Sequence, residues 1–143
     1  MATDRSASVV WQGDLMNGSG TIAQVPSGAF GPLDVSWASR AEEPNGKTSP
    51  EELIAAAWAS CFAMALSNGL AKAGNPPEKL ETSATVTFQP GEGIIRGALT
   101  VRGTVPGLDA DGFTAAAEDA KKNCPVSQAL SGIPDVTLQA SLA

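Results

Sequence analysis

Two cysteines, Cys61 and Cys124, are the residues of this chain whose side chains can carry thiol redox chemistry. A cysteine reacts as its thiolate, and apolar surroundings raise the pKa of a thiol. Cys61 lies in the apolar stretch 53–66, so it needs a nearby cation to ionise. Cys124 precedes Pro125, which suits the first turn of a helix, where backbone N–H groups and the helix dipole stabilise a thiolate. The sequence therefore predicts two thiols in different electrostatic surroundings.

We expect Arg40 to be the cation that serves Cys61, because it precedes the loop into the stretch that contains this cysteine. A carboxylate such as Glu51 would orient the guanidinium group through two hydrogen bonds. Lys47, Arg96 and Arg102 are the next candidates for the cation. Glu51 and Cys61 are ten residues apart, which is about 15 Å along a continuous helix. If both serve one centre, either two chains bring their helices together in antiparallel fashion, or the helix begins late.

Composition and spacing also allow a non-catalytic role for each of these residues. A free cysteine is among the most buried residue types, so Cys61 could be a core side chain. Glu51 could be a solvated residue of the first helical turn, and Arg40 a surface charge. The chain contains no histidine, which excludes histidine-based triads and metal sites. From the residue pattern alone, the purpose of the two thiols stays open.

One long helix is predicted to carry Cys61. Ser49 is a favourable N-cap, Pro50 suits the first helical position, and Glu52 completes a capping box. Gly74, followed by Asn-Pro-Pro, supplies the C-terminal stop, which gives a helix of about 24 residues. The helix is apolar nearly all round, so we expect it to be buried on most sides. The apolar run is too short for a membrane span, and the helix is interpreted as core.

The other elements are predicted from alternating apolar residues and from turn signals. The order of strands and helices contains no strand–helix–strand rhythm, which favours an α+β fold with antiparallel sheets around a long buried central helix. We expect a single domain over residues 1–143. The predicted elements are a hairpin over 7–25, a strand over 33–40, a hairpin over 80–105, helices over 109–122 and after 125, and a strand over 134–142.

Charge and cysteine content narrow the partners and the compartment. A formal net charge of −6 argues against nucleic acid or an anionic membrane as the main partner. The first residues lack the basic-then-apolar pattern of a signal peptide, so we expect a cytoplasmic protein with reduced thiols. Two cysteines in a reducing compartment are more often catalytic, redox-active or incidental than a structural disulfide.

Two motifs resemble the OsmC/Ohr family of cysteine-based hydroperoxide reductases. They are residues 46–66 (GKTSPEELIAAAWASCFAMAL) and residues 123–128 (NCPVSQ). Three shorter stretches resemble the branch of osmotically inducible protein C, namely 11–14 (WQGD), 18–21 (GSGT) and 105–109 (VPGLD). The resemblance covers essentially the whole chain. It implies an OsmC-like intertwined homodimer with two active sites at the interface.

The resemblance also implies residue roles. Cys61 matches the peroxidatic cysteine and Cys124 the resolving cysteine, while Arg40 and Glu51 match the pair that activates the thiolate. A hydroperoxide would oxidise Cys61 to a sulfenic acid, and Cys124 would condense with it to a disulfide. An external dithiol, such as a lipoylated protein or a small thiol, would then reduce this disulfide. No metal ion or bound cofactor is expected.

An apolar substrate pocket is expected around Cys61. We expect Trp58, Phe62 and Met64 to line it, which would favour organic hydroperoxides over hydrogen peroxide. Trp58 stands where relatives commonly have histidine or another aromatic residue. Two other functions compete with the peroxidase: a dimeric protein that binds a lipid-like ligand and has non-catalytic thiols, and a small scaffold with one structural disulfide.

Overall fold

The chain forms two compact units, Met1–Leu53 and Ile54–Ala143. The computed structural model describes all residues from 1 to 143. Each unit contains one three-stranded sheet, and the helices are segregated from the strands along the chain. This arrangement confirms the α+β class predicted from the sequence. The interpretation of residues 1–143 as one domain stays a prediction.

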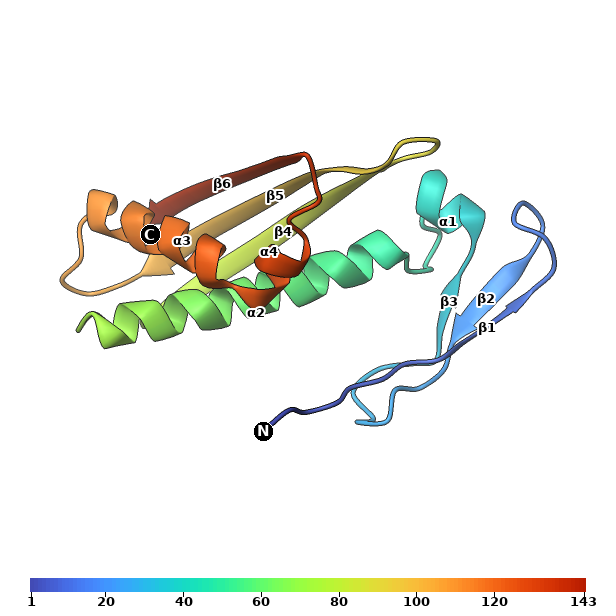
Figure 1. Ribbon diagram of the computed structural model, residues 1–143, viewed down its shortest axis with the longest axis horizontal. Coiled ribbons are helices and arrows are strands. Elements are labelled where there is room, and N and C mark those ends of the chain that lie inside the picture. The colour runs from blue at the N-terminus through green and yellow to red at the C-terminus, as the bar shows by residue number, and fades with distance from the viewer. The chain divides into compact units, whose positions relative to one another are not determined.

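The first unit is built on an antiparallel sheet of three short strands (Figure 1). The strands are β1 (Val9–Gln12), β2 (Ser19–Ile22) and β3 (Leu33–Val35), in that spatial order. β1 and β2 pair from Val9↔Ile22 to Gln12↔Ser19, which is the hairpin expected near the N-terminus. Ile22 and Val25 are the large apolar side chains that this unit buries.

The prediction of a strand over residues 33–40 is wrong for the second half of this range. β3 ends at Val35, and a short helix α1 (Trp37–Ala41) follows. The Ser36 hydroxyl accepts a hydrogen bond from the Ser39 N–H at 3.1 Å, and the Ser39 hydroxyl accepts one from the Ser36 N–H at 2.9 Å. This reciprocal capping box satisfies backbone donors that a strand would leave unpaired, and it overrides the apolar alternation. Arg40 therefore lies in the last turn of a helix and not at the exit of a strand.

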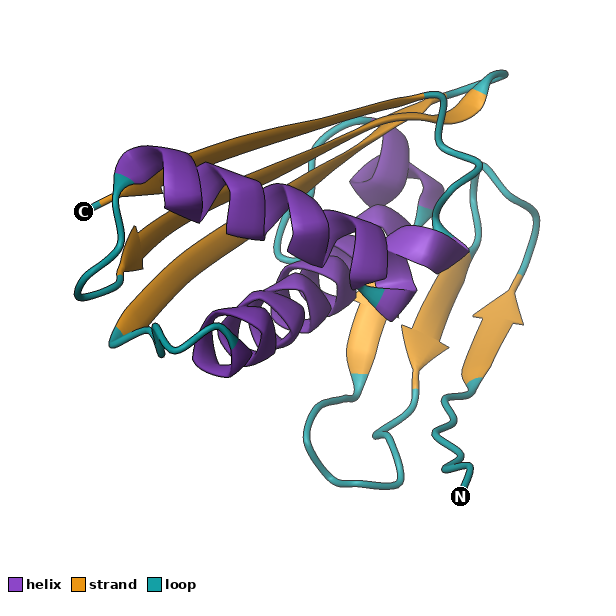
Figure 2. Ribbon diagram, turned by 60° about the vertical axis from the view of Figure 1, so that its left-hand side comes forward, coloured by secondary structure: helices purple, strands orange, loops and turns teal.

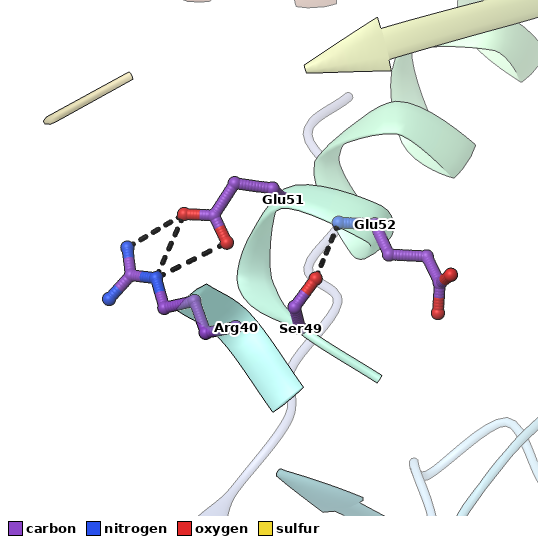
Figure 3. Close-up of polar contacts among 4 residues, drawn as sticks. All are labelled: Arg40, Ser49, Glu51 and Glu52. Carbon is purple, nitrogen blue, oxygen red and sulfur yellow. Dashed lines mark hydrogen bonds and ion pairs between the residues drawn. The ribbon is translucent and has the colours of Figure 1, made fainter. Parts of the chain in front are cut away.

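The long helix α2 (Pro50–Lys72) begins where the sequence predicts. The Ser49 hydroxyl accepts a hydrogen bond from the Glu52 N–H at 3.2 Å (Figure 3). The Glu52 carboxylate accepts from the Thr48 hydroxyl at 2.8 Å, so the capping box is formed in one direction only. Gly74, with φ of 91°, follows the helix in the left-handed conformation that favours glycine. The helix has 23 residues, against about 24 expected from its caps.

The second unit contains a larger sheet and three helical segments. Strands β4 (Lys79–Gln89), β5 (Gly93–Thr104) and β6 (Asp135–Leu142) form the sheet, and α3 (Ala110–Asn123) and α4 (Pro125–Ala129) connect β5 to β6. Helices α3 and α4 and the part of α2 that belongs to this unit lie on one face of the sheet (Figure 1 and Figure 2).

The prediction that all strands pair antiparallel is wrong for the last one. β4 and β5 form the expected antiparallel hairpin, but β6 pairs parallel to β5, from Arg96↔Asp135 to Gly103↔Leu142. The reason is that α3 and α4 carry the chain back along the sheet, so that β6 starts at the same end as β5. The sheet is therefore mixed.

Helix α2 contributes one apolar stripe to the core of the second unit. Trp58, Phe62, Leu66 and Leu70 recur every four residues and are fully or almost fully buried, so they lie on one side of the helix. On the other side Ala56, Ala57, Ser60 and Met64 are exposed. The prediction that this helix is buried on most sides is therefore wrong within this chain, where α2 is buried along one stripe only. The core partners of the stripe are Leu99, Val101, Val105, Phe113, Ala117, Ala120 and Cys124.

The expectation that the apolar run of this helix is too short for a membrane span is wrong by length and composition, because α2 meets both criteria for a membrane-spanning helix. Core helices of soluble proteins meet the same criteria. Four large side chains of α2 belong to the packed core of the second unit, as those of a core helix do.

Candidate active site

The thiols of Cys61 and Cys124 form a pair within the second unit. Cys61 lies in the middle of α2 and is partly buried, whereas Cys124 is 0% exposed and belongs to the core. Both cysteines are free, Cys61 packs against the core cluster that contains Cys124, and each thiol shifts the pKa of the other. Below, these two residues are called the thiol pair. Residues far apart in the sequence thus provide two sulfur atoms that face each other.

Cys124 is positioned by the junction of two helices. Its N–H donates to the Ala120 carbonyl at 2.8 Å, which closes the last turn of α3. Its carbonyl accepts from the Gln128 N–H at 3.0 Å, which opens the first turn of α4. Pro125 follows at the first helical position, where the missing N–H costs no hydrogen bond. One residue therefore ends α3 and starts α4, as the sequence predicted for Cys124 and Pro125.

The two thiols differ in acidity. Burial raises the pKa of the Cys61 thiol most strongly, the Val126 N–H lowers it by a smaller amount, and the neighbouring Cys124 raises it again. Burial also acts to raise the pKa of Cys124. The backbone N–H of Ser127, the Cys61 thiol, the Ser127 hydroxyl and the Val126 N–H together outweigh this and hold the pKa of Cys124 below its ordinary value. Within one chain, Cys124 is therefore the thiol that ionises more readily, and Cys61 is the one that needs a cation.

Arg40 and Glu51 form an ion pair within the first unit (Figure 3). Arg40 Nε donates to Glu51 Oε1 at 2.9 Å and to Oε2 at 3.2 Å, and Nη2 donates to Oε1 at 2.7 Å. Glu51 is 6% exposed, so its carboxylate is shielded from water while it holds the guanidinium plane. This is the geometry in which we expected Glu51 to orient Arg40. The two residues are called the activating pair below, and their role toward a thiolate stays a prediction.

A groove between α2 and α3 has a volume of about 720 Å³ and is lined in part by Cys61. Cys61, Met64 and Ala116 are among its lining residues, with Lys72 and Asp119 as the charged ones. Of the predicted pocket residues, Met64 lines this groove and is 72% exposed. Trp58 and Phe62 are instead part of the packed core. Their contact with a substrate stays a prediction.

Sequence reasoning did not single out Ser127. Its hydroxyl accepts a hydrogen bond of 2.7 Å from Trp58 Nε1. The available signal was its position three residues after Cys124, where a side chain in the first turn of a helix returns to the N-cap residue. For metal binding, no group of three or more His, Cys, Asp or Glu side chains with suitable placement occurs in residues 1–143.

Fold and site together define an α+β protein with a pair of facing thiols at a helix junction. The family model described as "OsmC-like protein" matches residues 43–139. The chain belongs to this family. The matched segment contains Glu51 and both cysteines, while Arg40 lies just before it.

Individual relatives agree with this assignment. The chain is 38% identical over 145 residues to "Peroxiredoxin OsmC" of Escherichia coli (strain K12), with 99% of each chain covered. It is 35% identical over 95 residues to an "Organic hydroperoxide resistance protein" of Xanthomonas axonopodis pv. citri, which covers 64% of this chain and 65% of the relative. Among solved structures, an OsmC-like protein from Mycoplasma pneumoniae has a TM-score of 0.74 at 13% identity and covers 100% of this chain and 99% of its own. This last likeness supports the fold alone.

Proposed function

We propose that this protein reduces hydroperoxides with its two cysteines and so detoxifies them. The observation that carries the proposal is the thiol pair, in which a partly exposed Cys61 faces a buried and more acidic Cys124. Membership of the OsmC-like family and 38% identity to a peroxiredoxin along the full chain support it. The protein is thus a cysteine-based peroxidase. The name of the Xanthomonas relative favours organic hydroperoxides as substrates.

The reaction proceeds in two steps on the chain itself. The Cys61 thiolate attacks the distal oxygen of ROOH, the O–O bond breaks, and RO⁻ takes a proton to become ROH while Cys61 becomes a sulfenic acid. The Cys124 thiolate then attacks the Cys61 sulfur, an S–S bond forms, and hydroxide departs and is protonated to water. An external dithiol, a lipoylated protein or a small thiol, reduces the disulfide back to two thiols. The lowered pKa of Cys124 favours the second step, because a larger fraction of the attacking thiol is then thiolate.

The activating pair supplies the cation for the first step. Burial raises the pKa of Cys61, so a positive charge close to the sulfur is needed to hold the thiolate at neutral pH. Glu51 fixes the guanidinium group of Arg40 through three hydrogen bonds. A guanidinium group fixed in this way can donate to the peroxide oxygen that becomes the alkoxide, and so stabilise it.

A homodimer brings the activating pair of one chain to the thiol pair of another. Ten residues separate Glu51 from Cys61 in the sequence, which is about 15 Å along a helix. This spacing favours a second copy as the source of Arg40 and Glu51. The exposed side of α2, with Met64 at its centre, offers an apolar surface for that copy. A cytoplasmic location stays a prediction.

Consumption of cumene hydroperoxide with dithiothreitol tests the proposal. We expect turnover by the wild-type protein and none by Cys61→Ser. Full activity of Cys61→Ser would contradict Cys61 as the reacting thiol, and no activity of the wild type would contradict a peroxidase. Either result would favour the two other functions, a dimeric protein that binds a lipid-like ligand, for which the groove beside Met64 offers space, or a small scaffold with one structural disulfide.

A further inference from the structure

Three asparagines of this chain, Asn17, Asn45 and Asn68, are each followed by a glycine. In such a pair the backbone nitrogen of the glycine can attack the side-chain carbonyl carbon of the asparagine, because glycine has no Cβ atom to hinder the approach and its backbone rotates easily. The attack requires a glycine nitrogen that is free to move toward the side chain. The structure gives the three glycine nitrogens very different freedom.

In two of the three pairs the glycine N–H already donates a hydrogen bond. The Gly18 N–H donates to the Asp14 carbonyl at 2.8 Å, and the Asp14 carboxylate accepts from the Asn17 N–H at 2.8 Å. Gly69 lies inside α2, where its N–H belongs to the hydrogen bonds of the helix. Attack on Asn17 or Asn68 therefore requires a hydrogen-bonded turn or a core helix to open first.

Asn45 and Gly46 form the middle of an exposed turn between α1 and α2. Both residues have positive φ, 48° and 80°, and the Lys47 N–H donates to the Pro44 carbonyl at 3.0 Å, as in a type I′ turn. A Cβ atom at Gly46 would meet no atom within 4 Å, so the space around it is open. The Gly46 N–H donates no hydrogen bond. Rotation of the Asn45–Gly46 peptide therefore breaks the one hydrogen bond of the turn and no other.

We propose that Asn45 is a site of spontaneous deamidation in the folded protein. The Gly46 nitrogen loses its proton and attacks the side-chain carbonyl carbon of Asn45, a C–N bond forms, and the side-chain nitrogen departs as ammonia, which leaves a five-membered succinimide. Water then opens this ring at either carbonyl and gives aspartate or isoaspartate. Water is the only co-reactant, and no atom is oxidised or reduced.

The modification changes the connection 42–47, which joins the helix of Arg40 to the helix of Glu51. Either product adds a negative charge to this connection, and the isoaspartyl product also lengthens its main chain by the side-chain methylene. The two ends of the connection are held from outside the turn, because the Ser39 hydroxyl donates to the Thr48 carbonyl at 3.1 Å. The change therefore stays within the turn, and the modified protein remains folded and accumulates.

Peptide mapping by mass spectrometry follows all three asparagines in one sample of the folded, full-length protein kept at mildly alkaline pH. Each conversion replaces an NH₂ group by OH, and an isoaspartyl-specific methyltransferase labels the isoaspartyl product. We expect Asn45 to be converted at least about tenfold faster than Asn17 or Asn68, since a difference of about 1.4 kcal/mol in opening free energy already gives this ratio. The rate should increase with pH, because the attacking nitrogen must lose its proton.

Two controls separate the effect of the fold from the chemistry of the dipeptide. Asn45→Gly removes the reacting amide and keeps the turn, because Gly-Gly also favours type I′, so the isoaspartyl label should disappear. In urea-unfolded protein the three sites should react at similar rates. Conversion of Asn45 in the folded protein no faster than that of Asn17 and Asn68 would overturn the inference. No peroxide enters these measurements, so a failure of the proposed function leaves their result unchanged.

Discussion

Cys61 and Cys124 are the same kind of side chain in opposite electrostatic surroundings. The N-terminal turn of α4 and the neighbouring thiol lower the pKa of Cys124 against the effect of burial, whereas burial raises the pKa of Cys61. The difference is set by backbone placement, because a residue at a helix N-cap meets unpaired N–H groups and a residue in mid-helix does not. The sequence predicted this contrast, since Pro125 marks the helix start.

The first prediction at this scale concerns the division of roles between the cysteines. Cys61→Ser should abolish turnover, whereas Cys124→Ser should allow one reduction event and leave a sulfenic acid, because resolution follows attack. Dimedone labelling after one equivalent of peroxide, read by mass spectrometry, checks this. Label on Cys124 in place of Cys61 would reverse the assigned roles.

The second prediction concerns Arg40. Arg40→Met keeps the aliphatic stem and removes the charge, so the pKa of Cys61 should rise. If a cation within about 4–6 Å shifts the pKa by about 1–3 units, peroxide reduction near neutral pH should fall roughly ten- to a thousandfold and recover as the pH is raised. Arg40→Lys should be intermediate, since a point charge cannot reproduce the bidentate contact with Glu51.

The pH dependence of Cys61 alkylation in each variant measures the effect of Arg40. Arg96→Met is the matched control, because Arg96 also pairs with a carboxylate, Asp135, at 3.2 Å, but on the exposed sheet. An alkylation profile that changes in Arg96→Met and not in Arg40→Met would place the activating cation elsewhere.

At the scale of elements, α2 is held against the sheet through the contact between Trp58 and β5. Gly97→Ala would place a Cβ atom 2.5 Å from the indole ring, and overpacking of this kind typically costs about 1–3 kcal/mol. We therefore expect a lower free energy of unfolding in urea for this variant. Gly132→Ala is the control, because a Cβ there meets no atom within 4 Å. Equal stability of the two variants would mean that the ring moves aside at little cost.

The sequence predicts the helices and strands correctly where local turn and cap signals agree with the tertiary structure. It fails where the local pattern and the tertiary structure favour different elements. Strong turn or cap residues mark three features: the ends of α2, the hairpin of β4 and β5, and the α3–α4 junction. The structure contains all three features. Ser36 was missed because apolar alternation continues through it, although Ser39 completes its capping box. The parallel pairing of β6 could not be predicted from local pattern, since strand direction depends on the path of α3 and α4. Ser127 was missed because its partner, Trp58, lies 69 residues away.

At the scale of the whole molecule, the exposed side of α2 predicts a stable homodimer. Met64 is 72% exposed at the centre of an apolar helix side, beside Ala57 and Ser60. A charge introduced there by Met64→Asp should be buried on association and so weaken the dimer strongly. Peroxidase activity should fall with it if the activating pair comes from the second copy.

Sedimentation velocity across micromolar concentrations measures this association. Gln139→Glu is the control, because it adds the same charge to an exposed position on β6, away from α2. A wild-type protein that sediments as a monomer while it turns over peroxide would contradict both the homodimer and the shared site.

If the proposed disulfide forms, the complete burial of Cys124 determines which of its two sulfur atoms a reductant can attack. In a disulfide between the two cysteines, an incoming thiolate can reach only the sulfur of Cys61, because Cys124 is 0% exposed. The reductant must therefore form its mixed disulfide on Cys61, with Cys124 as the leaving group. A thiol of low pKa leaves faster, so the hydrogen bonds that favour attack by Cys124 also favour its release. The same helix junction would then serve both halves of the catalytic cycle.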